Sequence, residues 1–439
     1  MPSVIVIGGG LAGLASAAAL GQSGFQVDLF EARGFLGGRA TSYPVPGDSA
    51  EVIDNCQHVL LRCCVNLMDF YARLGVADRI EFHKQFFFME PGGRTSVLQA
   101  GGLPAPLHFT GSFWDLTFLG PADKMAIARA LWAIRSEHRR RKDLDQITML
   151  DWLREKRQTE RAIGRFWNQV LVSAVNEDLD RMAASHGFRV FWLGFLARAN
   201  SYEMGIPAVP LGDLYGPEGW KRIPQVTMHA RAPVERVIVK DGAIHGLIAA
   251  GEEHTADYYV SALPFERLPA VIPELELNLE GFEHSPITGI HLWFDRSITE
   301  LPHATLLDRT IQWMFNKSRG RYLQLVVSAS RGLVEMPRAD VIALALRELA
   351  EFFPIAQEAK LEKAHVVKEI RATFSARPGL EQLRPVSTTQ FKNLFLAGDW
   401  TRSGWPPIME SAVRSGYLAA EAVTRAAGEA RTFLLPDIA

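Results

Sequence analysis

The stretch SVIVIGGGLAGLASAAAL, residues 3–20, decides the fold. It begins with β-branched residues, passes through three successive glycines and continues into an alanine-rich segment that favours a helix. A second apolar run, residues 26–30, follows Gly24. We therefore predict a strand, a tight turn, a helix and a second strand, which form a βαβ unit at the start of an α/β protein.

The glycines have the spacing Gly8-x-Gly10-x-x-Gly13, between the predicted strand and the predicted helix. The first glycine permits the turn, the second lets the backbone approach a pyrophosphate, and the third lets helix and strand pack closely. Glu31 ends the second strand, 18 residues after Gly13, where a carboxylate can accept hydrogen bonds from ribose hydroxyls and repel a 2′-phosphate. We predict a dinucleotide site that includes Gly8, Gly10, Ala12, Gly13, Glu31 and Ala32.

Two further segments favour FAD as this dinucleotide. Gly37, Gly38 and Arg39 follow the βαβ unit, so that Gly38 can pass beside a pyrophosphate and Arg39 can add a positive charge. Near the other end, NLFLAGD (393–399) reads as a strand and PPIMESA (406–412) opens a helix. Asp399, after Gly398, is placed to bind ribitol hydroxyls, and the helix N-terminus near Met409 to stabilise negative charge on a reduced flavin ring.

The middle of the chain has a different pattern. Residues 121–200 show helical spacing and predict a helical lobe at about 120–205. Residues 226–261 predict a three-stranded meander, 285–335 predict further strands, and 338–352 a helix. Aromatic runs at 86–88, 113–118 and 188–195 either line a long apolar tunnel or form ordinary core.

Composition limits the classes of function. Hydrophobic residues make up 48% of the 439 residues and charged residues 22%, as in a folded globular protein. A net charge of -2 argues against a nucleic-acid partner. The basic run 138–142 is either a solvated helix face or a contact for lipid headgroups.

The cysteines and the hydropathy of the chain indicate its compartment, and the spacing of metal-ligating residues indicates whether it binds a metal. The three cysteines, Cys56, Cys63 and Cys64, are odd in number and closely spaced, which fits reduced thiols in the cytosol. No metal-ligand spacing is present, so we predict no metal. Without an apolar stretch of about 18 residues, we expect a cytoplasmic protein, either free or peripheral on the inner face of the membrane.

The motifs together resemble a known group of flavoproteins. GGGLAGL (8–14), GGR (37–39), Val234, FLAGDWT (395–401) and PxxMESA (406–412) resemble the amine oxidase and phytoene desaturase superfamily. Within it, DNCQHVLL (54–61) and CCVNLMDFYARLG (63–75) resemble the squalene-associated FAD-dependent desaturases, or hydroxysqualene dehydroxylases.

This resemblance implies a Rossmann-like, glutathione-reductase-like FAD-binding domain and a substrate domain of mixed sheet with a helical lobe. The implied FAD domain is discontinuous and takes residues 1–80, 208–265 and 370–439, with Val234 at the cofactor. The implied substrate domain takes residues 81–207 and 266–369. An isoprenoid tunnel is expected between the two.

The implied reaction is reductive removal of the hydroxyl of hydroxysqualene, an apolar isoprenoid, to give squalene for hopanoid synthesis. A carotenoid or phytoene desaturase, an amine oxidase-like flavoenzyme and a flavin-binding scaffold without turnover stay open. Dehydroxylation needs a proton donor and walls that shelter an allylic cation. Asp54 or His58 is our hypothesis for the donor; the alternative is that Asp54 caps a turn and His58 packs against the flavin. The electron donor for the flavin is left unassigned.

Overall fold

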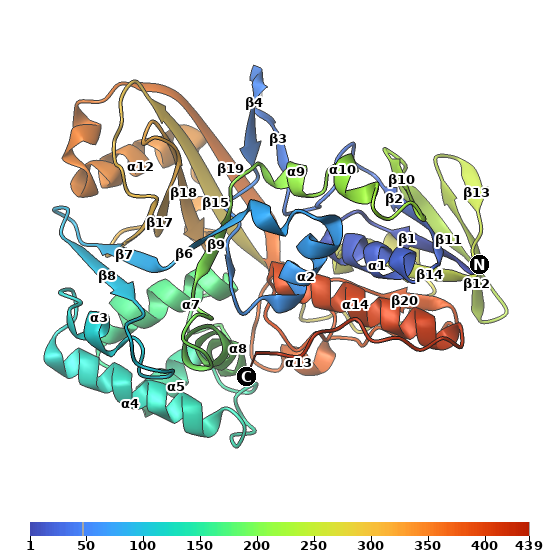
Figure 1. Cartoon of the computed structure of the whole chain (residues 1–439), viewed down its shortest axis with the longest axis horizontal. Helices are drawn as coiled ribbons and strands as arrows, with labels where there is room; N and C mark the ends of the chain where they lie inside the picture. The colour runs from blue at the N-terminus through green and yellow to red at the C-terminus, as the bar shows by residue number, and fades with distance from the viewer. Residues whose placement is uncertain (46–47, 439) are drawn as a thin grey trace.

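The computed structural model describes residues 1–45 and 48–438. A five-stranded parallel sheet holds the expected βαβ unit (Figure 1). All its neighbouring strands run parallel. In spatial order the strands are β10 (Val226–Ala230), β2 (Gln26–Glu31), β1 (Ser3–Ile7), β14 (Tyr258–Ser261) and β20 (Leu394–Leu396). The sheet therefore gathers strands from the beginning, the middle and the end of the chain.

The two faces of this sheet are covered differently. Val4 and Val6 of β1 belong to the hydrophobic cluster of α1 (Leu11–Gln22), α2 (Val65–Leu74) and α14 (Met409–Ala426). Ile5 and Ile7 belong to the other large cluster, with residues of an antiparallel meander. That meander comprises β11 (Val234–Lys240), β12 (Ala243–Ala249) and β13 (Glu252–His254). The alternation follows the two-residue period of a strand, because both faces are buried.

The second large sheet has seven strands and belongs to the other half of the molecule (Figure 1). Its spatial order is β19 (Leu361–Phe374), β15 (His284–Phe294), β18 (Tyr322–Ser328), β17 (Trp313–Ser318), β16 (His303–Leu306), β7 (Gln85–Met89) and β8 (Thr95–Gln99). One face packs on α12 (Arg338–Phe352) through alternate residues such as Leu292, Leu325 and Met314. The opposite face carries Trp313, Phe315 and Val326 into the cluster of the helical lobe.

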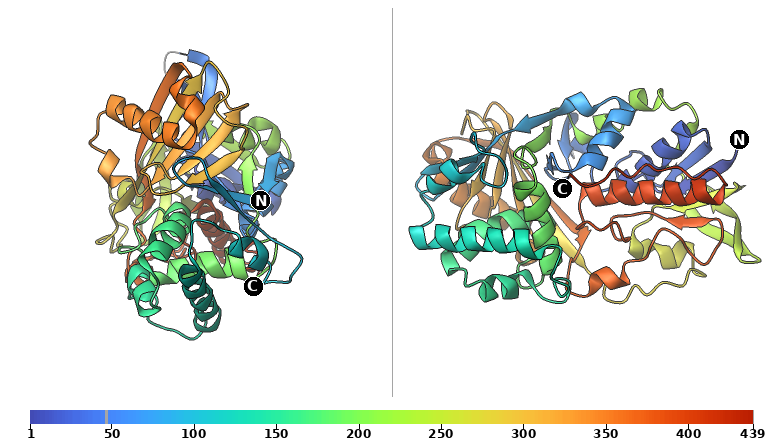
Figure 2. Two further views of the ribbon diagram at one scale, coloured as in Figure 1. Left: turned by 90° about the vertical axis from the view of Figure 1, so that its left-hand side faces the viewer. Right: turned by 60° about the horizontal axis from the view of Figure 1, so that its bottom comes forward.

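The helical lobe lies beside this sheet, at the end of the molecule far from the N-terminus (Figures 1 and 2). Its helices are α4 (Pro121–Glu137), α5 (Met149–Glu155), α6 (Glu160–Ala162), α7 (Asn168–Val175) and α8 (Ala184–Arg189), with π-helical turns at Ile163–Trp167 and Val190–Leu196. Short helices elsewhere are α3 (Thr110–Trp114), α9 (Leu211–Leu214), α10 (Pro217–Trp220), α11 (Leu268–Val271) and α13 (Leu380–Leu383).

Two small sheets link the halves. One is the hairpin of β3 (Ser42–Val45) and β4 (Asp48–Asp54). The other joins β5 (Leu60–Leu61) and β6 (Ile80–His83) to β9 (Met204–Pro207), which ends the segment of the helical lobe. Chain segments far apart in sequence are thus tied together next to α2.

The mixed α/β fold class is confirmed, with two differences in detail. The run at 226–261 holds five strands, not three, because its first and last strands, β10 and β14, join the parallel sheet and flank the expected meander. The boundary expected at residue 370 falls inside β19, which pairs with β15 along nearly its whole length. The three cysteines are free and buried.

The parallel sheet depends on a close approach of α1 and α14. A Cβ atom added at Gly416 of α14 would lie 2.2 Å from the Ala12 carbonyl oxygen and 3.0 Å from the Ser16 amide nitrogen. Because both contacts are backbone atoms of α1, neither can rotate away. Only glycine allows the helices to lie this close.

We predict that Gly416→Ala lowers the free energy of unfolding by about 1–3 kcal/mol, as overpacking typically does. Gly164→Ala is the control, since Gly164 is also helical and an added Cβ there meets nothing within 4 Å. Urea denaturation of both variants measures the effect. Equal stability of the two variants would contradict the close packing.

Candidate functional site

The glycine turn has the backbone geometry that the fingerprint requires. Gly8 has φ +107°, a conformation that disfavours L side chains. A Cβ on Gly13 would lie 2.0 Å from the Gly8 carbonyl oxygen, so the third glycine is needed for the helix to pack on the strand. Gly10 is the N-cap of α1 and no side chain caps it. The first amides of α1 are therefore free to bind an anion such as a pyrophosphate.

Glu31 lies against this turn. Its carboxylate accepts hydrogen bonds from the Gly9 amide at 2.7 Å and the Arg33 amide at 2.8 Å, which fix both oxygens. The adjacent Ala32 is exposed. The Ala232 amide donates to the Glu31 carbonyl at 2.9 Å, and β11 starts two residues later at Val234. Val234 and Glu31 therefore belong to the same end of the site.

The GGR loop covers the glycine turn. The Gly37 amide donates to the Gly9 carbonyl at 2.8 Å, and a Cβ on Gly38 would lie 3.0 Å from the Gly10 Cα. Gly38 also has φ +64°, a backbone conformation that favours glycine. Both the close contact and the backbone conformation therefore favour glycine at this position. The loop leaves a narrow passage lined by backbone, as a bound pyrophosphate needs.

Arg39 joins the two ends of the chain. Its guanidinium lies 2.6 Å from the Asp399 carboxylate and donates to the Ala372 carbonyl at 2.9 Å. Burial by itself would lower the pKa of Arg39, but the Asp399 carboxylate outweighs it and raises that pKa. Arg39 therefore holds Asp399 in place, 360 residues away, and its charge is shared with this carboxylate.

Gly398 and the start of α14 complete this region. Gly398 has φ +141°, and its amide donates to the Ser415 hydroxyl of α14 at 2.8 Å. Helix α14 begins at Met409 after Ile408, which makes no side-chain cap. The N-terminus of α14 thus offers free amides close to Asp399, and Asp399 is itself 6% exposed.

Glu410 has a role that sequence reasoning missed. It is fully buried and accepts hydrogen bonds from the Leu67 amide at 2.8 Å and the Asn66 side-chain amide at 2.8 Å. It therefore caps α2 from the first turn of α14. Burial raises the pKa of Glu410 to about 7 despite these donors. The MESA motif contained this residue, but nothing local in it indicates which helix the carboxylate caps.

The predicted cofactor residues thus meet in one region, with features that fit FAD: two uncapped helix N-termini, a glycine-lined passage and two fixed carboxylates. Glu31 and Val234 would hold the adenosine end, and Gly8, Gly10, Gly13 and Gly38 the pyrophosphate. Asp399 and the N-terminus of α14 at Met409 would hold the ribitol and flavin. Ala12 contributes mainly as the surface on which α14 packs.

Asp54 and His58 have contacts that favour their structural alternatives. Asp54 accepts hydrogen bonds from the Ser42 hydroxyl at 2.7 Å and the Leu211 amide at 3.0 Å, and pairs with Lys317 at 3.2 Å. With three donors around it, the Asp54 carboxylate acts as a hydrogen-bond acceptor, which favours its structural alternative over the role of proton donor. His58 Nδ1 lies 2.8 Å from the Cys56 carbonyl, and burial lowers the pKa of His58. A neutral imidazole holds no spare proton for a leaving hydroxyl.

Aromatic side chains gather on the face of the seven-stranded sheet that points away from α12. Trp313 and Phe315 stack at 5.5 Å between ring centroids, and Phe86 lies 6.4 Å from Trp313 and 6.3 Å from Phe195. His303 lies 6.3 Å from Phe86. We call these five residues, Trp313, Phe315, Phe86, Phe195 and His303, the aromatic cluster. Two of the three aromatic runs found in the sequence, 86–88 and 188–195, meet here.

A row of polar side chains crosses the same face. Strand register places His291 opposite Gln324, Gln324 opposite Phe315, and Phe315 opposite His303. In the described part of the chain, both ring nitrogens of His303, both amide atoms of Gln324 and Nε2 of His291 are buried without a hydrogen-bond partner. We call His291, Gln324 and His303 the polar row. Burial lowers the pKa of His291 and of His303 to about 3 in each case.

Such unpartnered groups need a physical explanation, because each one costs about 1–3 kcal/mol when left buried without a partner. Three such residues lie in one line on the face that carries the aromatic cluster, so their polar atoms are free to bind a polar group. The sequence shows the three residues, but their alignment comes only from the register of three strand pairs.

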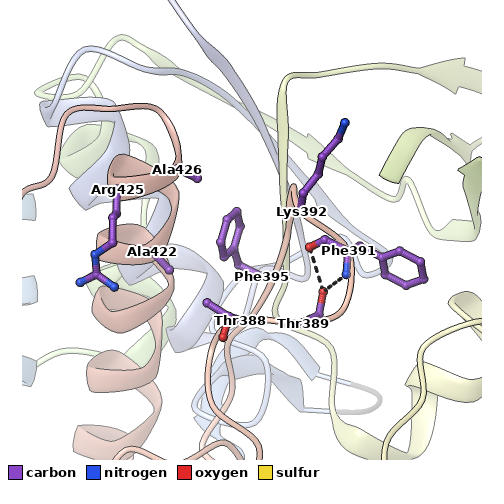
Figure 3. A pocket seen from close by; sticks show the side chains of 8 residues that line it. All are labelled: Thr388, Thr389, Phe391, Lys392, Phe395, Ala422, Arg425 and Ala426. Carbon is purple, nitrogen blue, oxygen red and sulfur yellow. Dashed lines mark hydrogen bonds between the residues drawn. The ribbon is translucent and has the colours of Figure 1, made fainter. Parts of the chain in front are cut away.

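A surface groove elsewhere does not belong to this site. It lies between α14 and the segment before β20, and its lining includes Thr389, Phe395 and Arg425 (Figure 3). The α14 residues that line it, Ala422, Arg425 and Ala426, are at the C-terminal end of this helix, whereas Met409 is at its N-terminal end. Within residues 1–45 and 48–438, no cluster of histidine, cysteine or acidic side chains is arranged for a metal, and no helix is long and apolar enough to cross a membrane.

Glu410 gives a pH prediction. Its pKa is raised in the folded protein, so the folded state binds a proton more tightly than the unfolded state does. Its contribution to stability is therefore lost as pH rises from about 5 to about 7.5, by up to about 3 kcal/mol. In Glu410→Gln this loss should disappear. Unfolding free energies of both proteins measured from pH 5 to pH 8 test the prediction, and parallel curves would contradict it.

Comparisons with known proteins agree with this geometry. The family model described as flavin containing amine oxidoreductase matches residues 11–424. The 15-cis-phytoene desaturase of an Oncidium hybrid cultivar is 26% identical, over 96% of this chain and 78% of its own. The probable zeta-carotene desaturase of Synechococcus elongatus is also 26% identical, over 96% of this chain and 98% of its own.

A solved structure shows the same fold. An oxidoreductase from Methanosarcina mazei superposes with a TM-score of 0.72 at 18% identity, over 94% of this chain and 98% of its own. The chain belongs to the flavin containing amine oxidoreductase family and is an FAD-dependent oxidoreductase.

Proposed function

We propose that the protein transfers a hydride between FAD and a long-chain isoprenoid. The observation that carries this proposal is the aromatic cluster, whose side chains are buried or half-buried on the sheet face opposite α12. Aromatic walls of this kind suit a substrate that binds by apolar contact. The identity to phytoene and zeta-carotene desaturases, over nearly the whole chain, supports the same substrate class.

Desaturation is the first candidate reaction, because the similar curated proteins carry that name. When bound, FAD supplies a hydride acceptor or, once reduced, a hydride donor. The residues of this chain would position it: the Arg39–Asp399 pair fixes a carboxylate that would bind the ribitol, and the N-terminus of α14 would stabilise negative charge on the ring. The aromatic cluster excludes water from the substrate.

Removal of the hydroxyl of hydroxysqualene is the second candidate, favoured by the polar row. A hydrocarbon such as a carotene precursor has no nitrogen or oxygen atom that can form a hydrogen bond with the side chains of His303 and Gln324. An alcohol does, because its hydroxyl can accept from Gln324 Nε2 and from a ring N–H of His303. The hydroxyl would leave as water, taking a proton from solvent, and the allylic carbon would take the hydride that reduced FAD supplies when bound; the faces of Trp313 and Phe315 can stabilise the positive charge on that carbon.

An anaerobic experiment distinguishes the two reactions. The reduced holoprotein is mixed with hydroxysqualene, the oxidised holoprotein with phytoene, and the products are identified by mass spectrometry. Squalene from the first mixture establishes dehydroxylation, and a more unsaturated product from the second establishes desaturation. If both mixtures return only starting material, the isoprenoid proposal is wrong.

The polar row provides a second test. Gln324→Leu and His303→Phe should each lower the turnover of an alcohol substrate at least roughly tenfold, because the hydroxyl loses its partner. Neither should slow the turnover of a hydrocarbon. Ser16→Ala is the control, since it removes an equally buried and unpartnered hydroxyl from α1. If alcohol turnover is unchanged in both variants, the row does not recognise the hydroxyl.

A further inference from the structure

Exposed apolar side chains are concentrated in the segment that contains α3 and α4. Among the described residues, five of the fourteen exposed large hydrophobic side chains fall between residues 103 and 132. Trp132 is 65% exposed and Met125 50% exposed, both on α4. The full set is Leu103, Leu107, Trp114, Met125 and Trp132. We call these five residues the α3–α4 surface.

This surface is not explained by the core. The inward face of α4 already packs through Ala126, Ile127, Ala130 and Ile134. Met125 and Trp132 are seven residues apart, so they share the opposite face of the helix. Trp114 lies next to α4, because Lys124 donates to the Trp114 carbonyl and its ammonium lies 5.9 Å from the Trp114 ring.

The same face is strongly basic. Residues 121–142 contain seven lysines and arginines but only two acidic residues, although the whole chain has a net charge of -2. Arg135 lies 5.2 Å from the Trp132 ring. Glu137, Asp143 and Glu155 face this region but pair with Arg141 and Lys156. The exposed Arg129, Arg135, Arg139 and Arg140 have no ion pair among the described residues.

We propose that the α3–α4 surface binds the surface of an anionic phospholipid bilayer. Tryptophan and methionine would enter the boundary between headgroups and acyl chains, where indole rings are favoured. The arginines would contact phosphates while their stems lie along the apolar surface. The positive charge of α4 favours an anionic lipid surface. Because the rest of the chain is acidic, an anionic surface would also orient the protein with α4 toward the lipid.

The position of the surface fits such a contact. Helix α4 lies along the outer edge of the helical lobe, with α3 beside it, at the end of the molecule opposite the N-terminus (Figures 1 and 2). The lobe can therefore touch a flat surface without burying the region of the FAD residues. The proposal rests on exposure and charge, and holds whatever substrate the enzyme takes.

Vesicle sedimentation of the FAD-loaded protein tests the proposal. With vesicles of equal phosphatidylglycerol and phosphatidylcholine, the native protein should sediment and should be released by 0.5 M NaCl. Met125→Ser with Trp132→Ser should lower the bound fraction roughly tenfold. Arg135→Glu with Arg139→Glu should lower it roughly as much.

Two variants control for general effects. Ile355→Ser removes an apolar side chain that is 42% exposed outside this surface, and Arg236→Glu reverses an exposed charge on β11. Both should sediment as the native protein does. The proposal is overturned if the native protein stays in the supernatant, or if the α4 variants bind as well as the controls. Self-association that Trp132→Ser abolishes, without vesicle binding, would assign the surface to a second copy and also overturn it.

Discussion

The close packing of α14 on α1 is the constraint on which the rest of the structure depends. Gly416 lies against the backbone of α1 at a distance that no side chain would permit. This contact places Gly398, Asp399 and the start of α14 next to the glycine turn at the other end of the chain. Without it, the parallel sheet would lose the helix that covers β20, and the two halves of the FAD site would separate.

Much of the FAD region could be predicted from the sequence, because its signals are local. Gly8, Gly10 and Gly13 sit between a β-branched run and an alanine-rich run, and each glycine has a steric reason visible in a short segment. The helices α2, α12 and α14 follow from apolar periodicity within a single element. The strand β19 was not predicted, because its residues alternate too irregularly to mark a strand of 14 residues.

Contacts between distant segments could not be predicted. Arg39 was expected to face a pyrophosphate, but it also pairs with Asp399, and no local pattern links these two positions. Glu410 caps α2 across 344 residues for the same reason. The polar row exists only because three neighbouring strand pairs have a particular register. Asp54 and His58 drew attention as a nearby acid and imidazole, and their partners, Lys317 and the Cys56 carbonyl, are contacts that no local pattern indicates.

The central claim is that segments from both ends of the chain form one FAD site. Its most direct test is the absorption spectrum of the purified protein, with the released cofactor quantified after denaturation. We expect flavin bands in the visible range and about one FAD per chain, and a ratio well below one in Asp399→Ala. A colourless protein that takes up no FAD when it is supplied would show that the two ends of the chain do not form an FAD site.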